Sequence, residues 1–161
     1  MHDMLLLFFL LISSMFDLLT RKVPNALVAF AGGIGLLVSV LPNSGTSFYM
    51  AVASFSIGLL LFLPPFLMNA LGAADVKIFA VSGLFMSPLE VVSAFFYTLL
   101  SGGILALIYF FIARVRKLEI AHWKVFQSNS LDSKESGVTL PYVVAIFFGV
   151  LIVNIVINTN N

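Results

Sequence analysis

Three long stretches of this sequence contain no aspartate, glutamate, lysine or arginine. They cover residues 23–74, residues 91–113 and the chain from Ser136 to its end. A helix needs about 20 mostly apolar residues to cross roughly 30 Å of hydrocarbon, so these stretches can supply several such helices. The whole chain is 61% hydrophobic and 9% charged, which is too little charge to cover a surface that faces water. These features exclude a soluble globular domain and a disordered chain, and they predict an all-α, polytopic integral membrane protein.

Proline, glycine, asparagine and clusters of charge divide the chain into six candidate transmembrane helices. They cover residues 4–19, 26–41, 48–68, 71–86, 89–112 and 138–157. The fourth segment is the weakest, because it is short and carries Asp75 and Lys77 near its start. For a chain of 161 residues we expect a single membrane-embedded domain, residues 1–161.

The distribution of positive charge predicts the orientation of these helices. If all six segments cross and both termini are extracytoplasmic, all eight basic residues lie on one side of the membrane. Lysine and arginine concentrate in cytoplasmic loops, so this side is the cytoplasm. We therefore expect a multi-pass protein of the inner (cytoplasmic) membrane. Its cytoplasmic loop, residues 113–138, either only fixes the orientation or also forms a surface that helps to receive a substrate.

The composition also excludes several kinds of partner and cofactor. A net charge of +1 provides no basic face for nucleic acid. The absence of cysteine excludes disulfides and thiolate metal sites, and two histidines far apart do not suggest a metal centre. We expect no metal ion and no other cofactor, and the sequence leaves the oligomeric state open.

Two aspartates lie within or beside the predicted membrane segments. A charged side chain inside the bilayer costs ~2.5–3.5 kcal/mol on the mildest scale, so it usually faces a bundle interior or marks a functional site. Asp17 shares a helix face with Ser13 and Ser14, and Asp75 opens the fourth segment. In the six-helix topology both carboxylates reach the cytoplasmic boundary. Two carboxylates that meet there can share a proton and activate water on a peptide carbonyl.

Each aspartate also has a structural interpretation. Asp17 is then an interfacial residue paired with Arg21, and Asp75 is a helix N-cap with Lys77 as a boundary anchor. Two further functional classes remain: a small proton-coupled transporter with the acids as a relay, and a non-enzymatic membrane assembly factor. Transporter sites usually form near the midplane of the membrane, whereas these acids lie near one boundary.

Residues 17–25 read Asp-Leu-Leu-Thr-Arg-Lys-Val-Pro-Asn, and residues 72–77 read Gly-Ala-Ala-Asp-Val-Lys. The first resembles a signature of the type IV prepilin leader peptidases, in which an aspartate precedes a Pro-Asn pair by seven positions. The second resembles the Gly-x-Gly-Asp-x-Lys signature of the same family, with Ala74 in place of the second glycine. The sequence Leu-Pro-Tyr at residues 140–142 is similar to the Pro-Tyr or Pro-Phe that opens the final helix of the family.

This resemblance implies an aspartic-type endopeptidase in which Asp17 and Asp75 are the catalytic pair and no metal is required. The implied partners are prepilin or pseudopilin precursors, whose short leader is cut at the cytoplasmic face. Residues that support the site or bind substrate are then Lys77, Gly72, Pro24 and Asn25. Because the cysteine-bearing insertion of larger members is missing, the chain is similar to the short, peptidase-only branch of tight-adherence pilus systems and archaeal preflagellin peptidases. Methyltransferase activity is not expected.

The neighbouring residues predict how the chain is built next to each acid. Pro24 ends the first helix, and Asn25 is expected to cap the second. Gly72 permits close packing or unusual backbone angles before Asp75. The electrostatics of helix ends favour an ionised Asp75 at a helix N-terminus and place the shared proton on Asp17 near a helix C-terminus.

Overall fold

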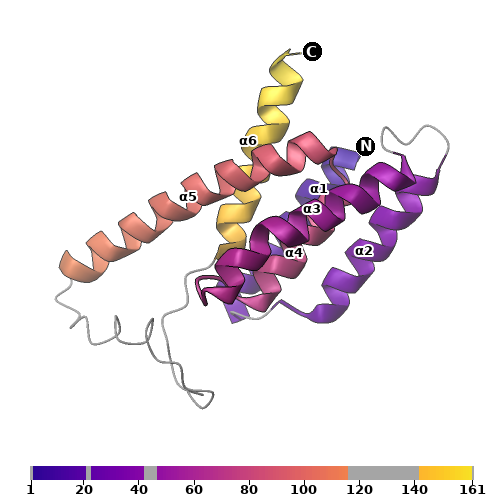
Figure 1. Cartoon of the computed structure of the whole chain (residues 1–161). Helices are drawn as coiled ribbons and strands as arrows, with labels where there is room; N and C mark the ends of the chain where they lie inside the picture. The colour runs from indigo at the N-terminus through magenta and orange to yellow at the C-terminus, as the bar shows by residue number, and fades with distance from the viewer. Residues whose placement is uncertain (1, 21–22, 42–46, 116–141, 161) are drawn as a thin grey trace.

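The computed structural model describes residues 2–20, 23–41, 47–115 and 142–160 (Figure 1). These residues form six α-helices and no strand, which confirms the all-α class. The helices are α1 (His2–Thr20), α2 (Asn25–Val40), α3 (Phe48–Leu67), α4 (Ala73–Gly83), α5 (Pro88–Val115) and α6 (Tyr142–Asn160). Most of the predicted loop, residues 113–138, lies outside the described residues, and α5 continues to Val115.

Three of the described helices are long and apolar enough to cross a membrane. The stretches are Asp3–Thr20 in α1, Phe48–Leu67 in α3 and Pro88–Ile108 in α5, while α2 and α6 contain shorter apolar stretches. Many large apolar side chains lie on the surface, such as Phe30 at 72% exposed and Phe111 at 70%. Such a surface suits lipid and not water. The chain is therefore a helical membrane protein, and six crossings with extracytoplasmic termini remain a prediction.

Helix α4 is shorter than the segment predicted for it. It has 11 residues, about 16 Å of helix, where residues 71–86 were expected to cross. After Gly83 the chain makes a tight turn, in which the N–H groups of residues 84, 85 and 86 each bond a carbonyl three residues earlier. Pro88 then begins α5, since proline is favoured at the first position of a helix.

Helix α4 is packed against α1, α2, α3 and α6. From Val76 to Met86 every residue except Lys77 is buried. Phe79 stacks on Phe62 of α3 with ring centroids 4.0 Å apart. At Gly83 an added Cβ would lie 2.7 Å from the carbonyl oxygen of Ser54, so the backbones of α3 and α4 touch only because Gly83 has no side chain. Neighbouring helices therefore fix the helix that carries Asp75.

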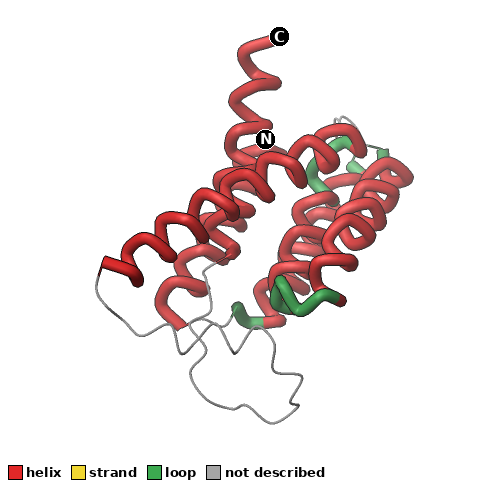
Figure 2. The backbone as a smooth tube through the Cα atoms, turned by 60° about the vertical axis from the view of Figure 1, so that its left-hand side comes forward, coloured by secondary structure: helices red, strands yellow, loops and turns green. Residues whose placement is uncertain are grey.

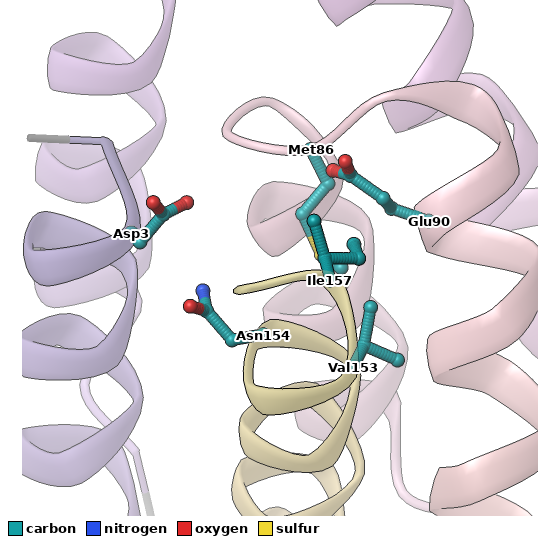
Figure 3. A pocket seen from close by; sticks show the side chains of 6 residues that line it. All are labelled: Asp3, Met86, Glu90, Val153, Asn154 and Ile157. Carbon is teal, nitrogen blue, oxygen red and sulfur yellow. The ribbon is translucent and has the colours of Figure 1, made fainter. Parts of the chain in front are cut away.

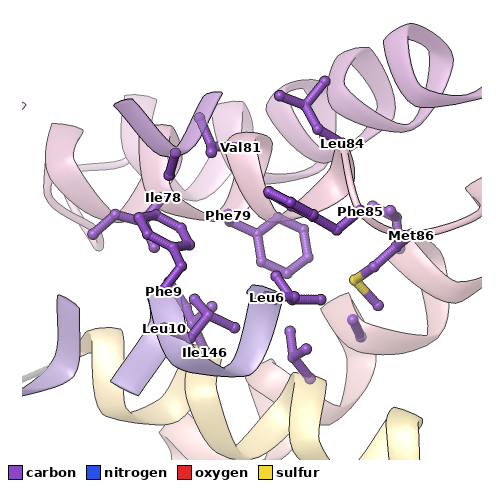
Figure 4. Packing of buried hydrophobic residues seen from close by; sticks show 14 of the residues in the cluster. Leu6, Phe9, Leu10, Ile78, Phe79, Val81, Leu84, Phe85, Met86 and Ile146 are labelled. Carbon is purple, nitrogen blue, oxygen red and sulfur yellow. The ribbon is translucent and has the colours of Figure 1, made fainter. Parts of the chain in front are cut away.

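The buried residues of all six helices form one hydrophobic core. Figure 4 shows its centre, where Leu6 and Leu10 of α1 lie between Phe79 of α4 and Ile146 of α6. Helices α5 and α6 are also joined by a hydrogen bond of 2.8 Å from the Ser101 hydroxyl to the Ala145 carbonyl oxygen. In Figures 1 and 2 the start of α1 and the end of α6 lie toward one end of the molecule, and the end of α1 and the start of α6 lie toward the other.

Candidate active site

Asp17 lies in the last turn of α1, beside the first turn of α6. The main-chain N–H of Val143 donates a hydrogen bond of 3.4 Å to Oδ2 of Asp17. One turn earlier on the same face, the Ser14 hydroxyl donates to the Val143 carbonyl oxygen, also at 3.4 Å. The predicted polar face of α1 therefore points into the bundle, and Asp17 is partly buried there. The side chain of Arg21, the alternative partner of Asp17, lies outside the described residues.

Asp75 is the third residue of α4, and its carboxylate closes the start of that helix. The N–H of Gly72, the N-cap residue, donates a hydrogen bond of 3.0 Å to Oδ2 of Asp75. This arrangement is half of a capping box, in which an acidic residue at the third position satisfies the N-cap N–H. Gly72 has an ordinary φ of −78°, and Ala74 is helical and exposed. The alanine in place of the family's glycine therefore costs no backbone strain.

The two aspartates lie close enough for their charges to interact. Asp75 precedes the buried part of α4, and the charge of Asp17 acts on its carboxyl group. Position at a helix N-terminus favours an ionised Asp75, whereas the like charge of Asp17 opposes it. The two carboxylates therefore influence each other's ionisation.

Tyr142, the first residue of α6, is a third side chain at this end of the molecule. It lies close enough to Asp75 for the carboxylate charge to act on its hydroxyl. Its ring packs edge-on against Phe62, with centroids 6.3 Å apart. Tyr142 belongs to the Leu-Pro-Tyr motif of the sequence, but the sequence predicted no role for it. Helix periodicity shows which residues share a face of one helix, and it cannot relate a residue of α6 to a residue of α4.

The remaining motif residues support the helix starts around the pair. Nζ of Lys77 donates a hydrogen bond of 3.3 Å to Oδ1 of Asn25, which joins the first turn of α4 to the first turn of α2. The prediction that Asn25 caps α2 is wrong. Pro24 is the N-cap residue, its carbonyl oxygen accepts the N–H of Leu27 at 3.0 Å, and Asn25 is the first helical residue. The amide of Asn25 is thus used between helices and not for capping.

A small open pocket lies at the other end of α1 and α6 (Figure 3). Its lining residues are Asp3, Met86, Glu90, Val153, Asn154 and Ile157. Because Asp3 and Asp17 are separated by 14 residues of helix, the two ends are about 21 Å apart. The pocket is therefore distinct from the aspartate pair. Among the described residues no group of three or more histidine, cysteine or acidic residues could hold a metal ion.

Residues 4–107, more than half of the chain, match the type IV leader peptidase family. No curated protein and no solved structure matches the chain. The matched region contains both aspartates, Gly72, Lys77 and the Pro24-Asn25 pair, and it ends before α6. From this match, the chain belongs to the type IV leader peptidase family.

Proposed function

We propose that this protein is a membrane-embedded aspartic endopeptidase that removes the leader peptide from prepilin or pseudopilin-like precursors. Asp17 and Asp75 are its catalytic pair. The single observation that carries the proposal is the proximity of these two carboxylates, which come from α1 and α4 and interact through their charges. Membership of the leader peptidase family supports the same reaction.

The chemistry follows from two carboxylates that share one proton. Two carboxyl groups at close range do not both ionise easily, because the two negative charges repel each other. One acid therefore keeps its proton while the other is a carboxylate. The carboxylate takes a proton from water as the water oxygen attacks the scissile carbonyl carbon, and the protonated acid gives its proton to the carbonyl oxygen. When the tetrahedral intermediate collapses, the C–N bond breaks and the leaving amine takes up a proton.

The location of the pair supports a substrate that enters from a membrane surface. Both aspartates are partly buried, and the residues that flank them are exposed: Thr20, Asn25, Ala73, Ala74 and Lys77. We place this end at the cytoplasmic face of the inner membrane, with all six helices crossing and both termini outside, because basic residues concentrate in cytoplasmic loops. A precursor with a short leader before a hydrophobic helix can then present its junction to the pair while its helix stays in the bilayer. No metal or other cofactor takes part in this scheme.

The test is a cleavage assay with the full chain purified in detergent. The probe is a synthetic precursor with a short leader before a hydrophobic helix, and mass spectrometry identifies the two products. We expect cleavage at the junction by the wild-type protein, and a loss of at least ~10³-fold in Asp17→Asn and in Asp75→Asn. Cleavage that persists in either variant, or an inactive wild-type protein, would contradict the proposal.

A further inference from the structure

The first turn of α6 lies against Asp17, and one of its main-chain N–H groups donates a hydrogen bond to that carboxylate. The first four N–H groups of a helix have no partner within the helix, and carboxylates near them are stabilised. Val143 is the second residue of α6, and its N–H is directed at Oδ2 of Asp17 at 3.4 Å. The carbonyl oxygen of the same residue accepts the Ser14 hydroxyl. Both main-chain groups of Val143 therefore bond to side chains of one face of α1.

The packing around this contact holds the donor in place. The side chain of Val143 is 1% exposed, and Leu10 and Ile146, one turn or more deeper along α1 and α6, are fully buried. Figure 4 shows Leu10 and Ile146 next to each other in the core. Because α1 and α6 cannot shift independently in such an interface, the direction of the Val143 N–H is fixed by tertiary structure.

Tyr142 occupies a space that α5 leaves open. A Cβ added at Gly102 of α5 would lie 2.8 Å from Cε2 of Tyr142 and 3.1 Å from its hydroxyl oxygen, whereas a Cβ at Gly103 meets nothing within 4 Å. Gly102 therefore allows the tyrosine ring to lie where it borders Asp75 and packs against Phe62. The first two residues of α6 thus contact or border both aspartates.

We propose that the first turn of α6 is a third component of the peptidase site, in which the main-chain N–H of Val143 is the positioning group for Asp17 and the ring of Tyr142 forms the wall beside Asp75. This inference rests on the proposed function and extends it to residues outside the family match at 4–107. The N–H holds one carboxylate oxygen of Asp17 in a fixed direction. The aspartates of two helices are thereby aligned by a third helix.

Proline substitution tests the donor, because proline has no N–H and is tolerated in the first turn of a helix. Val143→Pro removes the donor, and Val144→Pro, the matched control, places the same ring one residue later. With the synthetic precursor as probe, we expect kcat of Val143→Pro to fall about tenfold with KM unchanged, as loss of a hydrogen bond to a charged group predicts. Val144→Pro should retain kcat within about twofold.

A second pair of variants tests the wall and does not depend on proline. Gly102→Ala should displace the tyrosine ring and lower kcat roughly tenfold, because small misplacements in a site are costly. Gly103→Ala, one position along the same helix, should retain the wild-type kcat. Melting temperatures in detergent identify any variant that fails to fold, and if Val143→Pro fails, the glycine pair decides.

The outcomes separate this inference from the function on which it rests. A wild-type protein that does not cleave the precursor would overturn the proposed function. A wild-type protein that cleaves it, together with equal kcat values for Val143→Pro and Val144→Pro or for Gly102→Ala and Gly103→Ala, would overturn the role of α6 alone.

Discussion

Two acidic residues near opposite ends of α4 have the same local role and different surroundings. Asp75, at the third position of α4, accepts the N–H of Gly72 at 3.0 Å. Glu90, at the third position of α5, accepts the N–H of Ser87 at 2.9 Å. Each carboxylate therefore closes the start of its own helix in the same way.

The two carboxylates differ in which side chains of other helices lie near them. Asp75 meets the charge of Asp17, which lies near the end of α1. In Figure 3, Asp3 and Glu90 lie on opposite sides of their pocket, with Asn154 and Ile157 between them. The comparison teaches that an acidic residue at a helix start is a structural feature by itself. A second acid from another helix makes it a candidate for chemistry.

The largest expected difference between the two ends is in activity. Asp17→Asn and Asp75→Asn should lower kcat/KM for precursor cleavage at least ~10³-fold, because each removes one of the two groups that activate water. Asp3→Asn and Glu90→Gln, at the other end, should leave kcat/KM within about twofold. Equal losses at the two ends would remove the distinction between them.

The capping role of Glu90 predicts an effect on stability alone. Glu90→Ala removes the acceptor of the Ser87 N–H and should lower the free energy of unfolding by ~0.5 kcal/mol, with no change in kcat. Glu90→Gln keeps an acceptor oxygen and should lose less. Thermal unfolding of the two variants in the same detergent measures the difference, and a fall in kcat for Glu90→Ala would show that this end also takes part in catalysis.

The smallest expected effect concerns the link between α2 and α4. Lys77→Met and Asn25→Leu each break the hydrogen bond of 3.3 Å, and each should lower kcat/KM roughly twofold, as an exposed polar contact suggests. The double variant should lose no more than either single variant, because both remove one interaction. If Lys77 instead binds the precursor directly, Lys77→Met will raise KM and Asn25→Leu will not.

Much of the fold could be predicted from the sequence, because charge-free apolar stretches and helix-breaking residues are local signals. They predicted six helices whose ends lie within four residues of those in the described part of the chain, although α4 is five residues shorter than its predicted segment. The length of α4 depends on the turn after Gly83 and on the contact between Gly83 and Ser54, which no local pattern reveals. The inward face of α1 was predicted, since Ser14 and Asp17 share it.

The parts of the site that sequence could not supply all depend on contacts between helices. The role of Asn25 was assigned to capping, the commonest use of asparagine at a helix start, but its partner is Lys77 on α4. The donor from Val143 comes from α6, and a main-chain group leaves no signature in a sequence.

The central claim, that Asp17 and Asp75 converge in one site, can be tested in membranes with cysteine pairs. The chain has no native cysteine, so Asp17→Cys combined with Asp75→Cys supplies only two thiols. We expect a short bis-maleimide to link these two thiols within one chain, as measured by intact mass. Asp17→Cys combined with Glu90→Cys, which joins opposite ends, should react at each thiol separately. Equal linking of the two pairs, or no linking of the first, would contradict the convergence of the two aspartates.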